Sequence, residues 1–101
     1  MRRKQVSVFV ENTPGRLEAI LDALQSKNVS IRALSVSESA EFGIVRMILE
    51  DADRGQSALY ESGFTTRVDD LLSYHMPDVA GGLLNTVIKP LADAGINIKY
   101  F

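Results

Sequence analysis

The residues best suited to binding chemistry form the stretch ENTPGRL, which begins at Glu11 and links an alternating β pattern to a helical pattern. Thr13 is a good N-cap, and Pro14 suits the first helical position because its missing N–H would be unpaired there anyway. The next backbone N–H groups would lack intrahelical partners and, with the positive end of the helix dipole, would suit a carboxylate or phosphate oxygen. They belong to Gly15, Arg16 and Leu17. A helix start without any ligand has the same pattern, so this turn alone leaves both interpretations open.

A weaker second copy of the turn favours the binding interpretation. Residues 77–83 read PDVAGGL after another β-like run, with Ala80 where Pro14 stood. Gly81 follows Gly15 by 66 residues. An internal repeat of this kind indicates two structural units built on one plan.

Composition narrows the classes of protein. The 101 residues contain no Cys and a single histidine, His75, so disulfides and thiolate metal sites are excluded and we expect no metal or other cofactor. The net charge is −2 and basic residues cluster only at residues 2–4, which predicts no nucleic-acid partner. No run approaches ~18 apolar residues and no signal peptide is visible, so we predict a cytoplasmic protein without a membrane partner.

Hydrophobic periodicity predicts the elements that position the two turns. They are strands at residues 4–10, 29–38 and 44–49, helices at 17–28 and from Asp51 or Asp53 to Ser62, and an extended run at 64–76. The apolar parity changes within residues 29–38, which predicts either two partly covered faces or a β-bulge. Residues 39–43 are expected to make a hairpin return, and Gly63 to stop the second helix.

We divide the extended run at Asp69-Asp70, so that its first part completes the order βαββαβ and its second part opens a new unit. The economical architecture for this order is an α+β, ferredoxin-like sandwich, in which both helices lie on one face of an antiparallel sheet. A βαβ half-repeat follows, with a helix from Leu83 to Ala94 and a strand at 96–101. Pro90 should bend that helix or break a turn between Thr86 and Pro90.

The two copies differ by one residue. Leu91 follows Leu24 by 67 residues, whereas the glycines of the two turns are 66 residues apart. One residue has therefore been added in the later helix, near Leu83-Leu84.

With these motifs the sequence resembles ACT domains, small regulatory modules that bind amino acids and are attached to enzymes of amino-acid metabolism. It is most similar to stand-alone proteins that carry two such domains in tandem. The resemblance rests on NTPGRL at residues 12–17, KNVSI at 27–31, DVAGGL at 78–83 and GINI at 95–98. It implies one complete ACT-like domain at residues 1–70 and the first half of a second at 71–101.

The resemblance implies an amino-acid site at the interface between two ACT domains, where the turn of one meets the start of strand two of the other. Carried over by position, the candidates are Asn12, Thr13, Pro14, Gly15, Arg16, Leu17 and Ser30 in the first copy, and Asp78, Val79, Ala80, Gly81 and Asn97 in the second. Ser30 is shorter than Asn97, so the two sites should not be equivalent. The resemblance also implies a homo-oligomer, expected to be a dimer, and allows an enzyme of amino-acid metabolism as a further partner.

The second domain should continue beyond Phe101. We therefore expect either that the chain is truncated or that another copy completes its half-domain.

Three alternatives to a ligand-binding regulator follow from the same order of elements. Acylphosphatases share it, but residues 11–16 lack the glycine-rich phosphate cradle that such catalysis needs. RNA-binding sheets need exposed aromatic residues and a basic surround, which the central strands lack. An assembly module without a small ligand is the main alternative. We predict a non-catalytic module that binds a small amino acid and regulates amino-acid metabolism.

Overall fold

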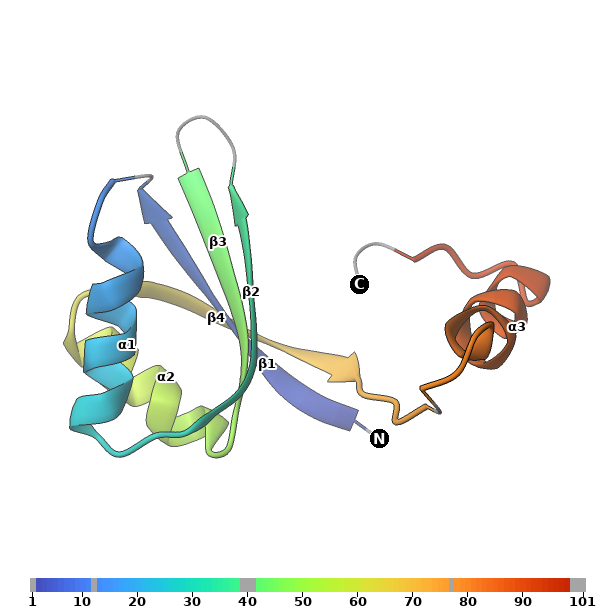
Figure 1. Ribbon diagram of the computed structural model, residues 1–101. Coiled ribbons are helices and arrows are strands. Elements are labelled where there is room, and N and C mark those ends of the chain that lie inside the picture. Colours follow the sequence, from blue (N-terminus) through green and yellow to red (C-terminus); the bar gives the residue numbers. More distant parts are fainter. Residues whose placement is uncertain (1, 12, 39–41, 77, 99–101) are drawn as a thin grey trace.

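Two helices cover one face of a four-stranded antiparallel sheet in the computed structural model, which describes residues 2–11, 13–38, 42–76 and 78–98 (Figure 1). The elements are β1 (Arg2–Glu11), α1 (Arg16–Ser26), β2 (Ile31–Glu38), β3 (Phe42–Leu49), α2 (Ala52–Glu61) and β4 (Thr65–Leu72). The strand order in the sheet is β2-β3-β1-β4. The predicted ferredoxin-like βαββαβ fold is confirmed.

The core lies between the helices and the inner face of the two central strands. Val6 and Val8 of β1 are fully buried, and they stand opposite Met47 and Val45 of β3. Side chains of a directly opposed pair share one face of a sheet, so the alternation in β1 and β3 buries one face. Ile20 and Leu24 of α1 and Leu59 of α2 cover that face. Helix periodicity and strand alternation therefore meet in one apolar layer.

The parity change in β2 is a β-bulge. Ile31 stands opposite Leu49 and Ala33 opposite Ile48, so the register shifts between Ile31 and Ala33. The bulge is one of the two outcomes that the sequence left open. The expected return at residues 39–43 falls largely on 39–41, which lie outside the described residues.

α2 is better defined than its composition suggests. The Asp51 carboxylate accepts a hydrogen bond from the Arg54 N–H at 3.0 Å, so Asp51 is the N-cap. Gly63 follows the helix with φ +85°, which confirms it as the stop. Gly55 lies buried inside α2, where a Cβ would overlap the Leu49 side chain. The helix approaches β3 too closely for any larger residue at that position.

The predicted division of the extended run at Asp69-Asp70 is wrong. β4 continues through both residues to Leu72, which stands opposite Arg2 of β1. β1 already begins at Arg2, so its backbone offers hydrogen-bond partners to these last residues of β4. The strand lasts as long as its neighbour does.

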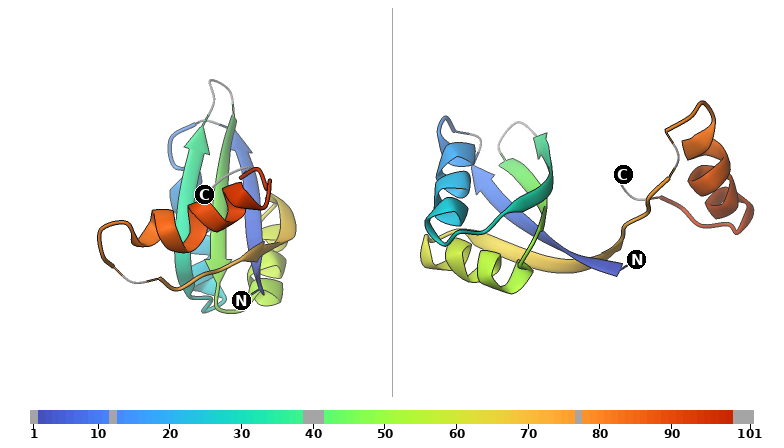
Figure 2. Two further views of the ribbon diagram at one scale, coloured as in Figure 1. Left: turned by 90° about the vertical axis from the view of Figure 1, so that its right-hand side faces the viewer. Right: turned by 60° about the horizontal axis from the view of Figure 1, so that its bottom comes forward.

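The second copy stands apart from the sheet at the end of a linker (Figures 1 and 2). Its helical segment covers residues 82–93 and includes η1 (Leu84–Ile88) and α3 (Lys89–Asp93). The helix of the predicted half-repeat is therefore present. Residues 73–76 and 96–98 form no strand, because no described segment lies beside them to pair with their backbones.

The helical segment absorbs the added residue in a π turn. The Lys89 N–H donates to the Leu84 carbonyl five residues earlier, so this turn holds one residue more than an α-helical turn. Pro90 comes next, at the start of α3, where its missing N–H costs least. The expected interruption between Thr86 and Pro90 is confirmed, and Gly95 with φ +74° ends the helix.

Replacing Gly55 by alanine should destabilise the fold even though alanine is the better helix former. The new methyl group meets Leu49, and Val29 and Leu24 lie 3.4 and 3.5 Å from the same point, so Leu49 has little room to move. We expect a loss of about 1–3 kcal/mol in the free energy of unfolding by urea. Ser57→Ala, at an exposed position of the same helix, is the control and should change stability by less than about 0.5 kcal/mol. Equal stability of the two variants would contradict the close packing.

Candidate functional site

The turn between β1 and α1 is built differently from the expected N-cap. The Thr13 N–H donates to the Glu11 carbonyl at 2.8 Å, and α1 begins at Arg16 after Gly15, whose φ is +84°. Gly15 is thus the N-cap, and the helix has no side-chain cap. The expectations that Thr13 caps the helix and that Pro14 opens it are wrong. The left-handed Gly15 reverses the chain by itself, so no side-chain cap is needed at Thr13.

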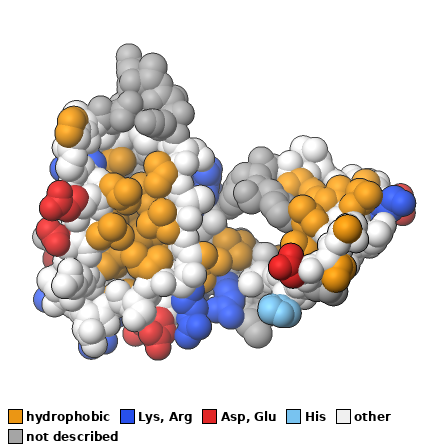
Figure 3. All heavy atoms as spheres, viewed as in Figure 1, with side chains coloured by type: hydrophobic (Ala, Val, Ile, Leu, Met, Phe, Trp, Pro, Cys, Tyr) orange, Lys and Arg blue, Asp and Glu red, His pale blue; other side chains and the backbone are white. Residues whose placement is uncertain are grey.

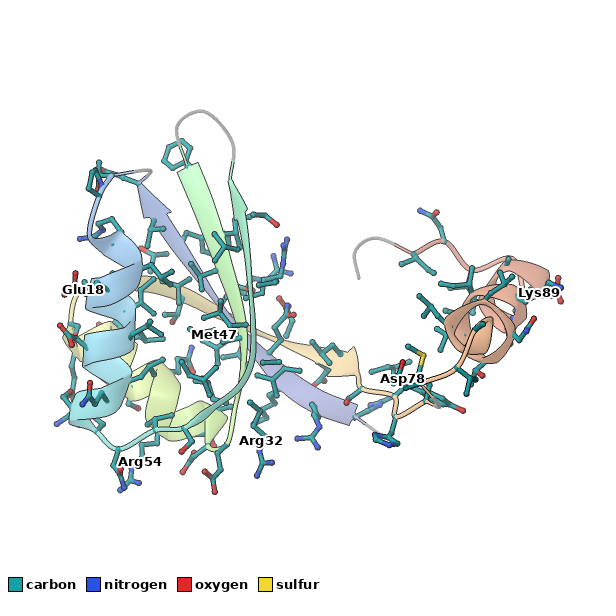
Figure 4. The ribbon with its side chains drawn as sticks, viewed as in Figure 1. Glu18, Arg32, Met47, Arg54, Asp78 and Lys89 are labelled. Carbon is teal, nitrogen blue, oxygen red and sulfur yellow. The ribbon has the colours of Figure 1, made fainter. Side chains whose placement is uncertain are left out.

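The anion-binding N–H groups shift along the chain by one residue. The Gly15 carbonyl already accepts the Ala19 N–H at 3.0 Å, which is the first turn of α1. The N–H groups without an intrahelical carbonyl partner therefore belong to Arg16, Leu17 and Glu18. Glu18 lies at this end of the helix in Figure 4. Arg16 and Leu17 remain among the donors that the sequence predicted.

A hollow of about 370 Å³ opens beside this turn. It is lined by Phe9, Val10, Glu11, Thr13, Arg16, Gly63, Phe64 and Thr65. The Arg16 guanidinium carbon lies 4.9 Å from the centre of the buried Phe64 ring, a cation–π contact. The ring therefore holds the Arg16 charge at the hollow.

The sequence analysis missed the side of the hollow that β4 supplies. Phe9 near the end of β1 stands opposite Thr65 at the start of β4, because the two strands are antiparallel neighbours. Gly63 and Phe64 come immediately before Thr65 and so reach the β1 turn. The ferredoxin-like order would have given the signal, since it makes the first and last strands neighbours.

The charges around the hollow suit a small zwitterion. Arg16 and the first N–H groups of α1 can bind a carboxylate, and the Glu11 carboxylate can accept from an ammonium group. Thr13 adds a hydroxyl group that can donate or accept. All three side chains belong to exposed residues, so a ligand reaches them from solvent.

The other candidate of the first copy lies elsewhere. Ser30 lines a second hollow, of about 250 Å³, together with residues around the end of α1. α1 has 11 residues and so is about 16 Å long, which separates Ser30 from the turn at Gly15. Within one chain the structure does not bring the two parts of the predicted site together. Asn12 is outside the described residues.

The candidates of the second copy flank the helical segment on the far side of the linker. Gly81 has φ +77° and its carbonyl accepts the Asn85 N–H at 2.9 Å. Asp78, Val79, Ala80 and Asn97 are exposed. Figure 4 shows Asp78 well away from the first turn, so the two turns do not form one site within this chain.

Metal and membrane chemistry have no visible support in the described residues. No three of their His, Asp and Glu side chains gather as a metal site would require. None of their helices is long and apolar enough to cross a bilayer.

A ferredoxin-like unit followed by a second copy of its turn and helix, with a polar hollow at the first turn, is the architecture of a tandem regulatory module. The chain belongs to the ACT domain family, because the family described as "ACT domain pair" matches residues 1–101. ACT domains are regulatory, non-catalytic modules that generally bind amino acids and oligomerise. A comparison with curated protein sequences gave no match.

Solved structures agree with this assignment. Protein BT0572 from Bacteroides thetaiotaomicron is 36% identical with a TM-score of 0.93, and the match covers 99% of this chain and 69% of that one. The regulatory subunit of aspartate kinase from Thermus thermophilus, in its ligand-free form, is 13% identical with a TM-score of 0.66, covering 95% of this chain and 72% of that one. The ACT domain of prephenate dehydrogenase from Bacillus anthracis is 22% identical with a TM-score of 0.56, covering 62% and 99%. The last two likenesses concern the fold alone.

Replacing Gly15 should test whether its backbone conformation shapes the turn. No atom lies within 4 Å of a Cβ placed there, so any cost of Gly15→Ala comes from the positive φ. We expect a loss of about 1–2 kcal/mol in the free energy of unfolding by urea. Gly15→Asn is the matched control, because Asn tolerates left-handed backbone better than Ala and should cost less. Equal losses for Ala and Asn would contradict this assignment.

Proposed function

We propose that this chain is a non-catalytic regulatory module that binds a small amino acid at the interface between two ACT domains. The observation that carries the proposal is the Arg16 guanidinium, held over the Phe64 ring at the first turn of α1 and beside the hollow. A fixed cation at a helix start, with a carboxylate across the same hollow, matches the two charges of an amino acid.

In the proposed complex the ligand carboxylate lies against Arg16 and the first N–H groups of α1. The ammonium group faces Glu11, and the Thr13 hydroxyl group hydrogen-bonds to either end. Pro14 and Gly15 shape the turn, and Leu17 supplies an apolar wall. The second copy contributes its turn, Asp78 to Gly81, and Asn97 in the same way to a site that is not equivalent.

An interface between two copies would complete the first site. Four exposed apolar side chains of α1 and β2 form what we term the α1–β2 surface: Leu17, Leu21, Leu34 and Val36. Figure 3 shows hydrophobic side chains gathered between α1 and β2. β2 is also an edge strand of the sheet, so its outer backbone groups can pair with another strand.

A two-fold axis across the middle of α1 would explain why the parts of the site lie apart in one chain. The start of α1 in one copy would then lie next to the end of α1 in the other, which brings Arg16 close to the Ser30 of the partner copy. The homodimer that the sequence implied is thus a requirement of the site. The same surface also supports the second candidate function, an assembly module with no small ligand.

The expected affinity suits the sensing of a metabolite pool. An amino acid has about ten heavy atoms, and roughly 0.5 kcal/mol per atom gives a dissociation constant between micromolar and millimolar. We propose a cytoplasmic regulator of amino-acid metabolism with residues 1–70 as one ACT-like domain and 71–101 as part of a second, acting on an enzyme of that metabolism.

Thermal melts against a panel of amino acids at millimolar concentration should identify the ligand class. A ligand at ~100 times its dissociation constant adds about 2.7 kcal/mol, which raises the melting temperature by on the order of 10 °C for a chain of this size. No shift from any amino acid, together with a stable dimer, would favour the assembly module.

Arg16→Glu should weaken binding of the amino acid found in that panel at least tenfold in a calorimetric titration, because it places a negative charge beside the ligand carboxylate. The variant should keep its circular dichroism spectrum. Arg54→Glu, an exposed arginine at the start of α2, is the charge-matched control and should bind normally. Unchanged affinity of Arg16→Glu would remove Arg16 from the site.

A further inference from the structure

The helical segment of the second copy begins as α1 does. Gly81 and Gly15 both have left-handed backbone, with φ of +77° and +84°. Each carbonyl accepts the N–H four residues later, that of Asn85 at 2.9 Å and that of Ala19 at 3.0 Å. The two helix starts therefore share one backbone geometry.

The helix ends also correspond. The Val29 N–H donates to the Leu24 carbonyl at 3.0 Å, and the Ile96 N–H donates to the Leu91 carbonyl at 2.9 Å. In each copy the residue before this donor is left-handed: Asn28 has φ +56° and Gly95 has φ +74°. This is the same hydrogen-bonded helix end in both copies. Residues 81–96 therefore have the start and the end that α1 has in a finished domain.

Burial is where the copies differ. Leu24 and Val29 are buried against the sheet, and Val29 is 8% exposed. Their counterparts are Leu91, which is half-buried, and Ile96, which is 55% exposed. The hydrophobic side chains of this segment are open to solvent in Figure 3. The second copy thus has the apolar face of a domain helix without the sheet that should cover it.

The first domain shows what a covering partner must look like. It consists of two βαβ halves, β1-α1-β2 and β3-α2-β4, with β1 paired to β3, β2 beside β3 and β4 beside β1. Exchanging the halves turns the order β2-β3-β1-β4 into β4-β1-β3-β2, which is the same sheet read backwards. A complete unit is therefore two βαβ halves about an approximate two-fold axis, and a half can be completed by another half of the same kind.

We propose that, in this 101-residue chain, a second copy covers the apolar face of the helical segment. Residues 73–76 and 78–98 of two chains join about a two-fold axis to form one four-stranded unit with both helical segments on one face. Residues 73–76 of each chain take the central positions that β1 and β3 hold, and residues 96–98 pair with residues 73–76 of the partner. The second turn and Asn97 then belong to a unit that neither chain forms alone. The linker leaves this segment clear of its own sheet and accessible to a partner (Figure 2).

Light scattering on purified chains tests the proposal, with the α1–β2 surface disabled so that it cannot contribute. Leu34→Asp places a charge on that surface and should leave a dimer of 101-residue chains. Adding Leu91→Asp should convert this dimer to a monomer with half the mass. Adding Lys89→Asp instead, at an exposed position of the same helical segment, should leave it dimeric. Leu91 lies outside the core of the first domain, so all variants should keep the same melting transition for that domain.

Amide hydrogen exchange locates the contact. Exchange in residues 82–93 of Leu34→Asp should slow at least tenfold between micromolar and millimolar chain concentration, while exchange in α1 stays constant. A monomeric Leu34→Asp chain, or a dimer that survives Leu91→Asp, would overturn the proposal. Because amino-acid binding at the first turn is measured separately, failure here leaves the proposed function standing, and failure of ligand binding leaves this dimer standing.

Discussion

The pairing of β1 on both of its edges is the constraint on which the rest of the structure depends. β3 on one side supplies the valine and methionine partners of its buried face, and β4 on the other continues as far as β1 can offer hydrogen bonds. Because β4 starts where β1 ends, Phe64 reaches the turn that leads into α1. The core, the length of the last strand and the hollow therefore follow from one strand position.

Local patterns predicted most of the elements because each element is stabilised by short-range signals. Helical spacing, the Asp51 cap, the stop at Gly63 and the parity change at the β2 bulge all lie within a few residues of the feature they indicate. The end of β4 was not predictable in this way. Asp69-Asp70 reads as a break, yet a strand ends where its neighbour stops offering backbone groups, and that information lies some 65 residues away in β1.

The candidate site divides along the same line. The turn and Arg16 were visible in the sequence, whereas Phe64, which holds the Arg16 charge, comes from another part of the chain. The role of Thr13 was misjudged because a capping residue and a left-handed glycine both satisfy a helix start, and only the backbone angle of Gly15 distinguishes them. The weakness attributed to α2 was a misreading of Gly55, whose small size permits close contact with β3.

The π turn at η1 preserves helical phase. In an α-helix one extra residue would rotate every later side chain by about 100° around the axis and carry Leu91 away from the face that its counterpart Leu24 uses. The wide turn takes up that residue in a single loop of the helix, so the side chains after it keep their original directions. Two repeats can in this way diverge in helix length and still present the same face to a sheet.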